Sequence, residues 1–118
     1  MPERQSILGA MPAARFLLDH WQQRPLLIRD ALPGYTSPIT PDELAGLALE
    51  AEVESRIVLE VGVDGPWELR TGPFEAASFE TLPETQWTLL VQAVDLWLPE
   101  VAALLDHFDF LPRWRLDD

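Results

Sequence analysis

Apolar residues recur at the spacing of an α-helix in the stretch MPAARFLLDHWQQRP, where Ala13, Phe16, Leu17 and Trp21 fall on one side. Pro25 disfavours helical backbone at the residue before it, so the pattern predicts that this helix ends near Gln23. The apolar run that follows at once, residues 26–29, predicts a short strand.

Residues 41–51 carry the sharpest helix signal of the chain. Thr40 suits the N-cap position, and Pro41 suits the first helical position because its missing N–H has no partner there. Glu43 completes a capping box with Thr40. A further helix is expected in the stretch PEVAALLDHF, beginning at Pro99.

Alternating apolar and polar residues flank the turn dipeptide Asp64-Gly65 and predict a β-hairpin. The apolar positions are Ile57, Leu59 and Val61 before the turn, and Trp67 and Leu69 after it. Residues 87–94 are rich in β-branched and aromatic side chains, which predicts a strand buried on both faces. Between them, the stretch FEAASFETLPET reads as a loop or short helix.

The chain closes with FDFLPRWRLDD, in which residues 113–116 alternate polar and apolar side chains. This pattern predicts the beginning of a half-buried strand. Helices and strands alternate along the chain, but the hairpin interrupts any regular β-α-β order. The expected fold class is therefore α+β, in a single unit covering residues 1–118.

Composition narrows the classes of function. The chain has 118 residues, of which 47% are hydrophobic, and no cysteine, so disulfides and thiolate chemistry are excluded and a reducing, cytoplasmic setting is expected. No apolar run approaches the roughly 20 residues that cross a bilayer. The net charge of −12 disfavours direct binding to nucleic acid and favours a basic protein partner.

The most suggestive chemical motif is His107-Phe108-Asp109. A His-x-Asp pair on a strand, joined by a distant second histidine, forms the iron site of non-haem oxygenases. Here the pair falls at the end of an expected helix, where a separation of two residues does not bring side chains together. We therefore interpret His107 as a residue of the helix C-terminus and Asp109 as a turn residue, not as metal ligands.

No other constellation completes a catalytic site. His20, the second histidine, lies in a helical stripe, and no titratable group is spaced to orient it as a base. The serines lack the Gly-x-Ser-x-Gly pattern of a nucleophile elbow. The chain also contains five tryptophans, which favour core packing over a recognition surface: Trp21, Trp67, Trp87, Trp97 and Trp114.

Four stretches, in order, resemble the cupin-like, JmjC-type ribosomal oxygenases: FLLDHWQQRPLLIR, ITPDELAGLALEAEVESRIV, GPWELRTGPF and WTLLVQAVDLWLPEVAALLDHFDFLPRWRLDD. Within that family the chain is most similar to the bacterial hydroxylases that modify an arginine of ribosomal protein uL16. The resemblance implies an N-terminal segment whose helices, hairpin and flanking strands precede and brace a double-stranded β-helix barrel. It gives His107 and Asp109 no ligand role.

The same resemblance implies an activity that needs iron(II), 2-oxoglutarate and dioxygen, with a basic ribosomal protein as substrate. It places the iron and 2-oxoglutarate ligands in the barrel, so the chain is expected to be catalytically incomplete, whether its truncation is natural or deliberate. The alternative is a stand-alone acidic module that binds a basic protein. A carboxylate-based hydrolase has no supporting constellation.

An incomplete assembly is expected to expose a strand edge and apolar surface. We therefore expect the chain to form homo-oligomers, through residues 114–118 or through the strand at residues 87–94.

Overall fold

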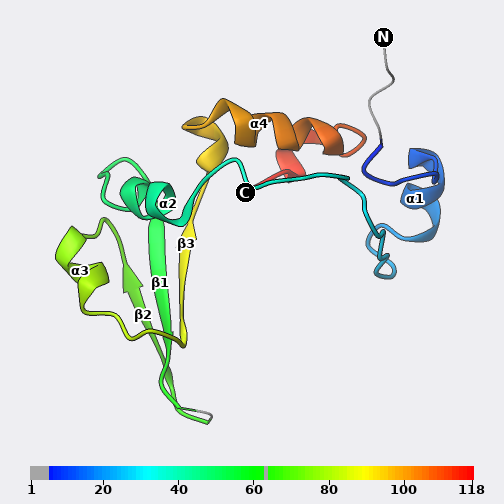
Figure 1. Cartoon of the computed structure of the whole chain (residues 1–118). Coiled ribbons are helices and arrows are strands. Elements are labelled where there is room, and N and C mark those ends of the chain that lie inside the picture. The colour runs from blue at the N-terminus through cyan, green and yellow to red at the C-terminus, as the bar shows by residue number, and fades with distance from the viewer. Residues whose placement is uncertain (1–5, 63) are drawn as a thin grey trace.

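The computed structural model describes residues 6–62 and 64–118, which form a three-stranded antiparallel sheet with short helices around it (Figure 1). The fold class is α+β, as expected. In chain order the helices and strands are α1 (Ala13–Asp19), α2 (Pro41–Leu47), β1 (Ser55–Glu60), β2 (Trp67–Thr71), α3 (Ala76–Glu80), β3 (Trp87–Val91) and α4 (Pro99–Leu105). Three 3₁₀ turns, η1 (Val94–Leu96), η2 (Asp106–Phe108) and η3 (Arg113–Arg115), complete the described elements.

The predicted hairpin is confirmed as β1 and β2, and β1 is the central strand of the sheet. The strand order is β2-β1-β3, with both pairs antiparallel. Ile57 stands opposite Arg70 on β2 and Leu89 on β3. Asp64 and Gly65 lie between β1 and β2 as predicted, next to residue 63, which is outside the described residues. Val61 lies beyond the end of β1 and is exposed.

One face of the sheet carries the core. Side chains alternate across a strand, so residues 55, 57 and 59 of β1 share this face and are all buried. Ile57 and Leu59 pack with Ala48, which follows α2, and with Phe74, from the loop after β2. The partly buried residues that surround this cluster are Phe79, Leu82, Trp87, Leu89 and Val91.

The opposite face of the sheet is exposed. It carries Val58, Leu69 and Leu90, with Trp67 at the start of β2, and the side chains of Leu69 and Trp67 are 60% and 66% exposed. The prediction that residues 87–94 form a strand buried on both faces is therefore wrong. β3 ends at Val91, and its side chains alternate between half-buried and exposed.

The N-terminal region differs from its prediction in two places. α1 ends at Asp19 rather than near Gln23, because the chain turns at His20 and Gln22 adopts a left-handed backbone conformation (φ 62°). Residues 26–29 form no strand and make no ladder with another segment of the described chain. A short apolar run becomes a strand only when a partner satisfies its backbone groups.

α2 begins as predicted, with the complete capping box. The Glu43 N–H donates to Thr40 Oγ1 at 3.1 Å, and the Thr40 N–H donates to Glu43 Oε1 at 3.1 Å. The helix ends at Leu47 rather than Ala51, and turns carry the chain into β1. α3 is the short helix allowed for in its stretch, and α4 begins at Pro99 as predicted.

The end of the chain is not the predicted strand. Residues 113–115 form η3, and only Leu116 and the residues after it are extended. Asp118 lies beside the residues that follow β3, where the Ala93 N–H donates to the Asp118 carbonyl at 2.8 Å. The prediction failed because alternation over four residues also fits a 3₁₀ turn on a partly exposed surface.

The whole structure is elongated, with principal extents of 47 × 36 × 28 Å and a radius of gyration of 17.7 Å. A compact chain of this length has a radius of gyration of about 13.5 Å. The sheet and α1 lie at opposite ends, joined by α4 and long irregular segments (Figure 1). This shape explains why so many large apolar side chains remain exposed.

Candidate functional site

His107 and Asp109 lie at the end of α4, where the prediction placed them. His107 belongs to η2, and Asp109 caps the end of that turn. Both border a cavity of about 240 Å³ that is also lined by Asp106 and Phe110. The Nδ1 atom of His107 is buried and has no hydrogen-bond partner, whereas Asp109 is exposed. That neither residue is a metal ligand stays a prediction.

His20 caps the end of α1, and its ring stacks on Phe16 with centroids 6.2 Å apart. Phe16 in turn contacts Phe110 edge to face, with centroids 5.6 Å apart. His20 is therefore part of an aromatic contact between α1 and the segment after α4. Within residues 6–62 and 64–118, no three His, Cys, Asp or Glu side chains gather closely enough to hold a metal ion.

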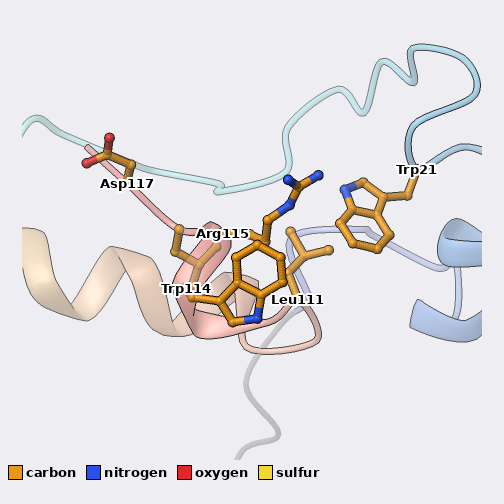
Figure 2. A pocket seen from close by; sticks show the side chains of 6 residues that line it. Trp21, Leu111, Trp114, Arg115 and Asp117 are labelled. Carbon is orange, nitrogen blue, oxygen red and sulfur yellow. The ribbon is translucent and has the colours of Figure 1, made fainter.

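A cavity of about 530 Å³ lies between the turn after α1 and the C-terminal segment. Its lining residues are Trp21, Leu111, Trp114, Arg115, Leu116 and Asp117. The guanidinium carbon of Arg115 is 5.8 Å from the ring centroid of Trp21 and 5.3 Å from that of Trp114. Figure 2 shows Arg115 extending between the two indoles, with Asp117 at the far side.

This arrangement combines a planar cation with two aromatic faces. The indole rings attract the guanidinium, and its N–H donors suit a carboxylate or phosphate oxygen. Sequence reasoning missed this cluster, because Trp21 lies far from residues 111–117 in the chain and no periodicity links them. The signal that the sequence does offer is the alternation in Arg113-Trp114-Arg115, which predicts a strand.

The prediction that the tryptophans are mainly core residues is largely wrong. Trp67, Trp97 and Trp114 are exposed, and the side chain of Trp114 is 80% exposed. Trp21 and Trp87 are half-buried, and only Trp87 packs against the core cluster. The core is too small to cover five indoles, so most of them lie on the surface.

The C-terminal segment docks through its last residue. The Asp95 N–H, in the first turn of η1, donates to Asp118 Oδ2 at 3.0 Å. Burial raises the pKa of the Asp118 carboxyl, and the hydrogen bond between the Asp118 and Asp95 side chains raises it further. The contact therefore brings two acidic side chains together, in a chain that is already strongly acidic.

Comparison with known proteins adds a direct observation. No protein-family model matches the chain. The chain is, however, 50% identical over 103 residues to the ribosomal protein uL16 3-hydroxylase of Escherichia coli. The resemblance to the ribosomal oxygenases is confirmed. A probable ribosomal oxygenase of Haemophilus influenzae is 37% identical over 103 residues.

The folds of ribosomal oxygenases agree with this one. The structure of YcfD, a ribosomal oxygenase from E. coli, in complex with cobalt and succinic acid matches 92% of the chain at 47% identity, with a TM-score of 0.82. The complex of YcfD with cobalt and 2-oxoglutarate matches with a TM-score of 0.81. These matches cover 29% of the YcfD chain.

The chain spans about a quarter of the length of the ribosomal oxygenases that it matches: 26% of the E. coli protein and 25% of the H. influenzae protein. Each match covers 87% of this chain. Among its described residues, no helix combines the length and the apolar character needed to cross a bilayer.

Proposed function

We propose that this chain is a segment of an iron(II)- and 2-oxoglutarate-dependent oxygenase that hydroxylates a ribosomal protein. The observation that carries the proposal is the 50% identity over 103 residues to a uL16 3-hydroxylase. The complex of the related YcfD with cobalt and 2-oxoglutarate supports the cofactor class, because a divalent transition metal and 2-oxoglutarate are the pair that such an oxygenase needs.

In this proposal the chain is catalytically incomplete alone, and its helices and hairpin brace a double-stranded β-helix barrel that carries the iron and 2-oxoglutarate ligands. Iron(II), when bound in that barrel, would activate dioxygen for the oxidation. The described residues of this chain offer no cluster of three possible ligands, so we derive no step of the oxidation from them. The contribution of these residues is to support the barrel and to help set its shape.

The substrate in this proposal is an arginine of uL16, a basic ribosomal protein, modified in the cytoplasm. The net charge of −12 supports it, because an acidic surface attracts a basic protein and raises the rate of encounter. The same charge is what an independent acidic binding module would use. The charge therefore does not separate the two functions. What separates them is whether this sequence works as part of an active oxygenase.

A chimera tests the proposal. The matched 103 residues of the E. coli hydroxylase are replaced by those of this chain, and uL16 is incubated with the chimera, iron(II) and 2-oxoglutarate. We expect uL16 to gain the mass of one oxygen atom, detected by mass spectrometry. The 118-residue chain alone is expected to produce neither this gain nor succinate from 2-oxoglutarate.

The control is the same chimera carrying His107→Ala, which should retain activity because His107 has no ligand role in this proposal. A folded chimera without activity contradicts the proposal, and so does 2-oxoglutarate turnover by the chain alone. Salt-sensitive binding of uL16 by the isolated chain, together with an inactive chimera, would favour the acidic binding module.

A further inference from the structure

A groove of about 360 Å³ lies beside α2 and is lined mainly by apolar side chains. Ile39 and Leu47 contribute from the N-terminal flank and the last residue of α2, and Trp97 and Leu98 from the segment before α4. Ile39, Leu47 and Leu98 are half-buried, whereas Trp97 is 44% exposed. We call this cavity the α2 groove. It presents an indole and aliphatic side chains together to a ligand.

Two carboxylates also line the α2 groove. Glu43, Gly46 and Glu50 are spaced by three and four residues, so they share one side of the helical turns. These turns continue past the end of α2, because the Glu50 N–H donates to the Leu47 carbonyl at 3.1 Å. A helix rises about 10 Å over seven residues, so the two glutamates lie on either side of Gly46.

The negative charge at the α2 groove has no positive partner within the described chain. Glu43 and Glu50 are exposed, and neither forms an ion pair with another described residue. One oxygen of Glu43 accepts the N–H of Thr40, which leaves the second oxygen for a ligand. Residues 40–55 contain five acidic residues and no basic one. The charge around this groove therefore attracts a cation and repels an anion.

We propose that the α2 groove binds an arginine side chain from a basic segment of a partner protein. The guanidinium would pair with Glu50 through its parallel N–H donors, while its planar face suits the Trp97 indole. The aliphatic stem of the arginine would lie against Leu47 and Leu98. That the basic segment belongs to the ribosomal substrate rests on the proposed function.

Charge decides between an arginine and an apolar occupant. An apolar segment placed in the α2 groove would take Glu43 and Glu50 out of water without any compensating partner, which is costly for a carboxylate. An arginine instead satisfies both parts of the lining, because it combines an apolar stem with a charged head. The mixture of an indole, aliphatic side chains and unpaired carboxylates therefore favours a basic partner.

Binding of fluorescently labelled uL16 to the chimera described above, measured by anisotropy without iron(II) or 2-oxoglutarate, tests the α2 groove. Gly46→Leu fills the groove without changing its charge, because a Cβ atom at Gly46 meets open space and leucine suits a helix. We expect it to raise the Kd at least about fivefold. Glu50→Lys repels a cation and should raise the Kd about fivefold at low salt.

Glu80→Lys is the matched control, because it changes the net charge equally at an exposed residue of α3 that does not line the groove. Its Kd should stay within about twofold of that of the unsubstituted chimera. Circular dichroism checks that each variant folds, and Glu50→Lys carries the test if Gly46→Leu does not. A folded Gly46→Leu or Glu50→Lys variant with an unchanged Kd overturns the proposal, as does an equal loss in Glu80→Lys.

The binding assay separates this proposal from the proposed function, because it requires no turnover. An active chimera whose affinity for uL16 is unaffected by Gly46→Leu and Glu50→Lys overturns the α2 groove alone. An inactive chimera whose affinity falls in both variants, but not in Glu80→Lys, supports the groove and contradicts only the oxygenase assignment.

Discussion

At the scale of single residues, Gly72 packs closely against β1. The Gly72 N–H donates to the Ser55 carbonyl at 2.8 Å, and Ser55 is only 2% exposed. A Cβ atom on residue 72 would overlap with Ser55 Oγ and press on the Phe74 ring. Gly46, in α2, has open space around the same position. The packing therefore leaves no room for a side chain at residue 72 but does leave room at residue 46.

Gly72→Ala and Gly46→Ala are expected to change stability in opposite directions. We expect Gly72→Ala to lower the free energy of unfolding by about 1–3 kcal/mol, because a buried neighbour must move. Gly46→Ala should raise it by about 0.5–1 kcal/mol, because alanine loses less backbone entropy in a helix. Urea denaturation followed by circular dichroism measures both, and equal effects of the two substitutions would contradict the packing described for Gly72.

Asp118 is expected to make the C-terminal contact depend on pH. Its pKa is raised by burial and by Asp95, so the native state holds the proton more tightly than the unfolded chain. This contribution to stability is complete below the ordinary aspartate pKa of about 3.9 and is lost as the pH rises through the raised, native pKa. The contact between Asp118 and the residues that follow β3 is therefore more stable at acidic pH.

The amide resonance of Asp95, which donates to Asp118 Oδ2, reports this titration by NMR. We expect a midpoint above the ordinary aspartate value in the native chain and loss of that transition in Asp118→Asn. Asp117→Asn serves as the control and should retain most of the shift. An unchanged transition in Asp118→Asn would assign it to a different group.

At the scale of elements, the start of α2 depends on contacts within its own first turn, whereas β2 depends on pairing with another strand. α2 is seven residues long, too short to be stable by propensity alone, and begins with a reciprocal pair of hydrogen bonds between Thr40 and Glu43. β2, by contrast, is exposed along its whole length and depends on its ladder with β1. A cap acts within one turn, whereas a strand requires its partner.

Thr40→Ala should therefore destabilise the chain by about 1 kcal/mol, the typical value of an N-cap. The substitution leaves the Glu43 N–H without its acceptor and removes half of the capping box. Thr40→Ser retains a hydroxyl and should lose much less. Thermal unfolding followed by circular dichroism compares the three chains, and equal loss in both variants would show that the methyl group, not the hydroxyl, stabilises the helix start.

At the scale of the whole molecule, the radius of gyration of 17.7 Å shows that the chain does not close around a single large core. The core cluster gathers on one side of the sheet, while the opposite face of the sheet and the indole of Trp114 remain exposed. The chain spans about a quarter of the length of the ribosomal oxygenases that it matches.

The sequence by itself determined the features that depend on neighbouring residues. The capping box at Thr40, the start of α4 at Pro99 and the hairpin with its Asp64-Gly65 turn dipeptide all follow from residue types a few positions apart. It also determined the resemblance to the ribosomal oxygenases, because ordered motifs along a chain are independent of how that chain packs.

Only the tertiary structure decided which apolar residues are buried. Residues 26–29 and 113–116 have strand-like patterns but find no ladder partner, and β3 is covered on one face alone. The cavity between Trp21 and Arg115 likewise joins segments from the two ends of the chain. The physical reason is the same in each case: backbone pairing and burial need a second surface, and a local pattern contains no information about where that surface lies.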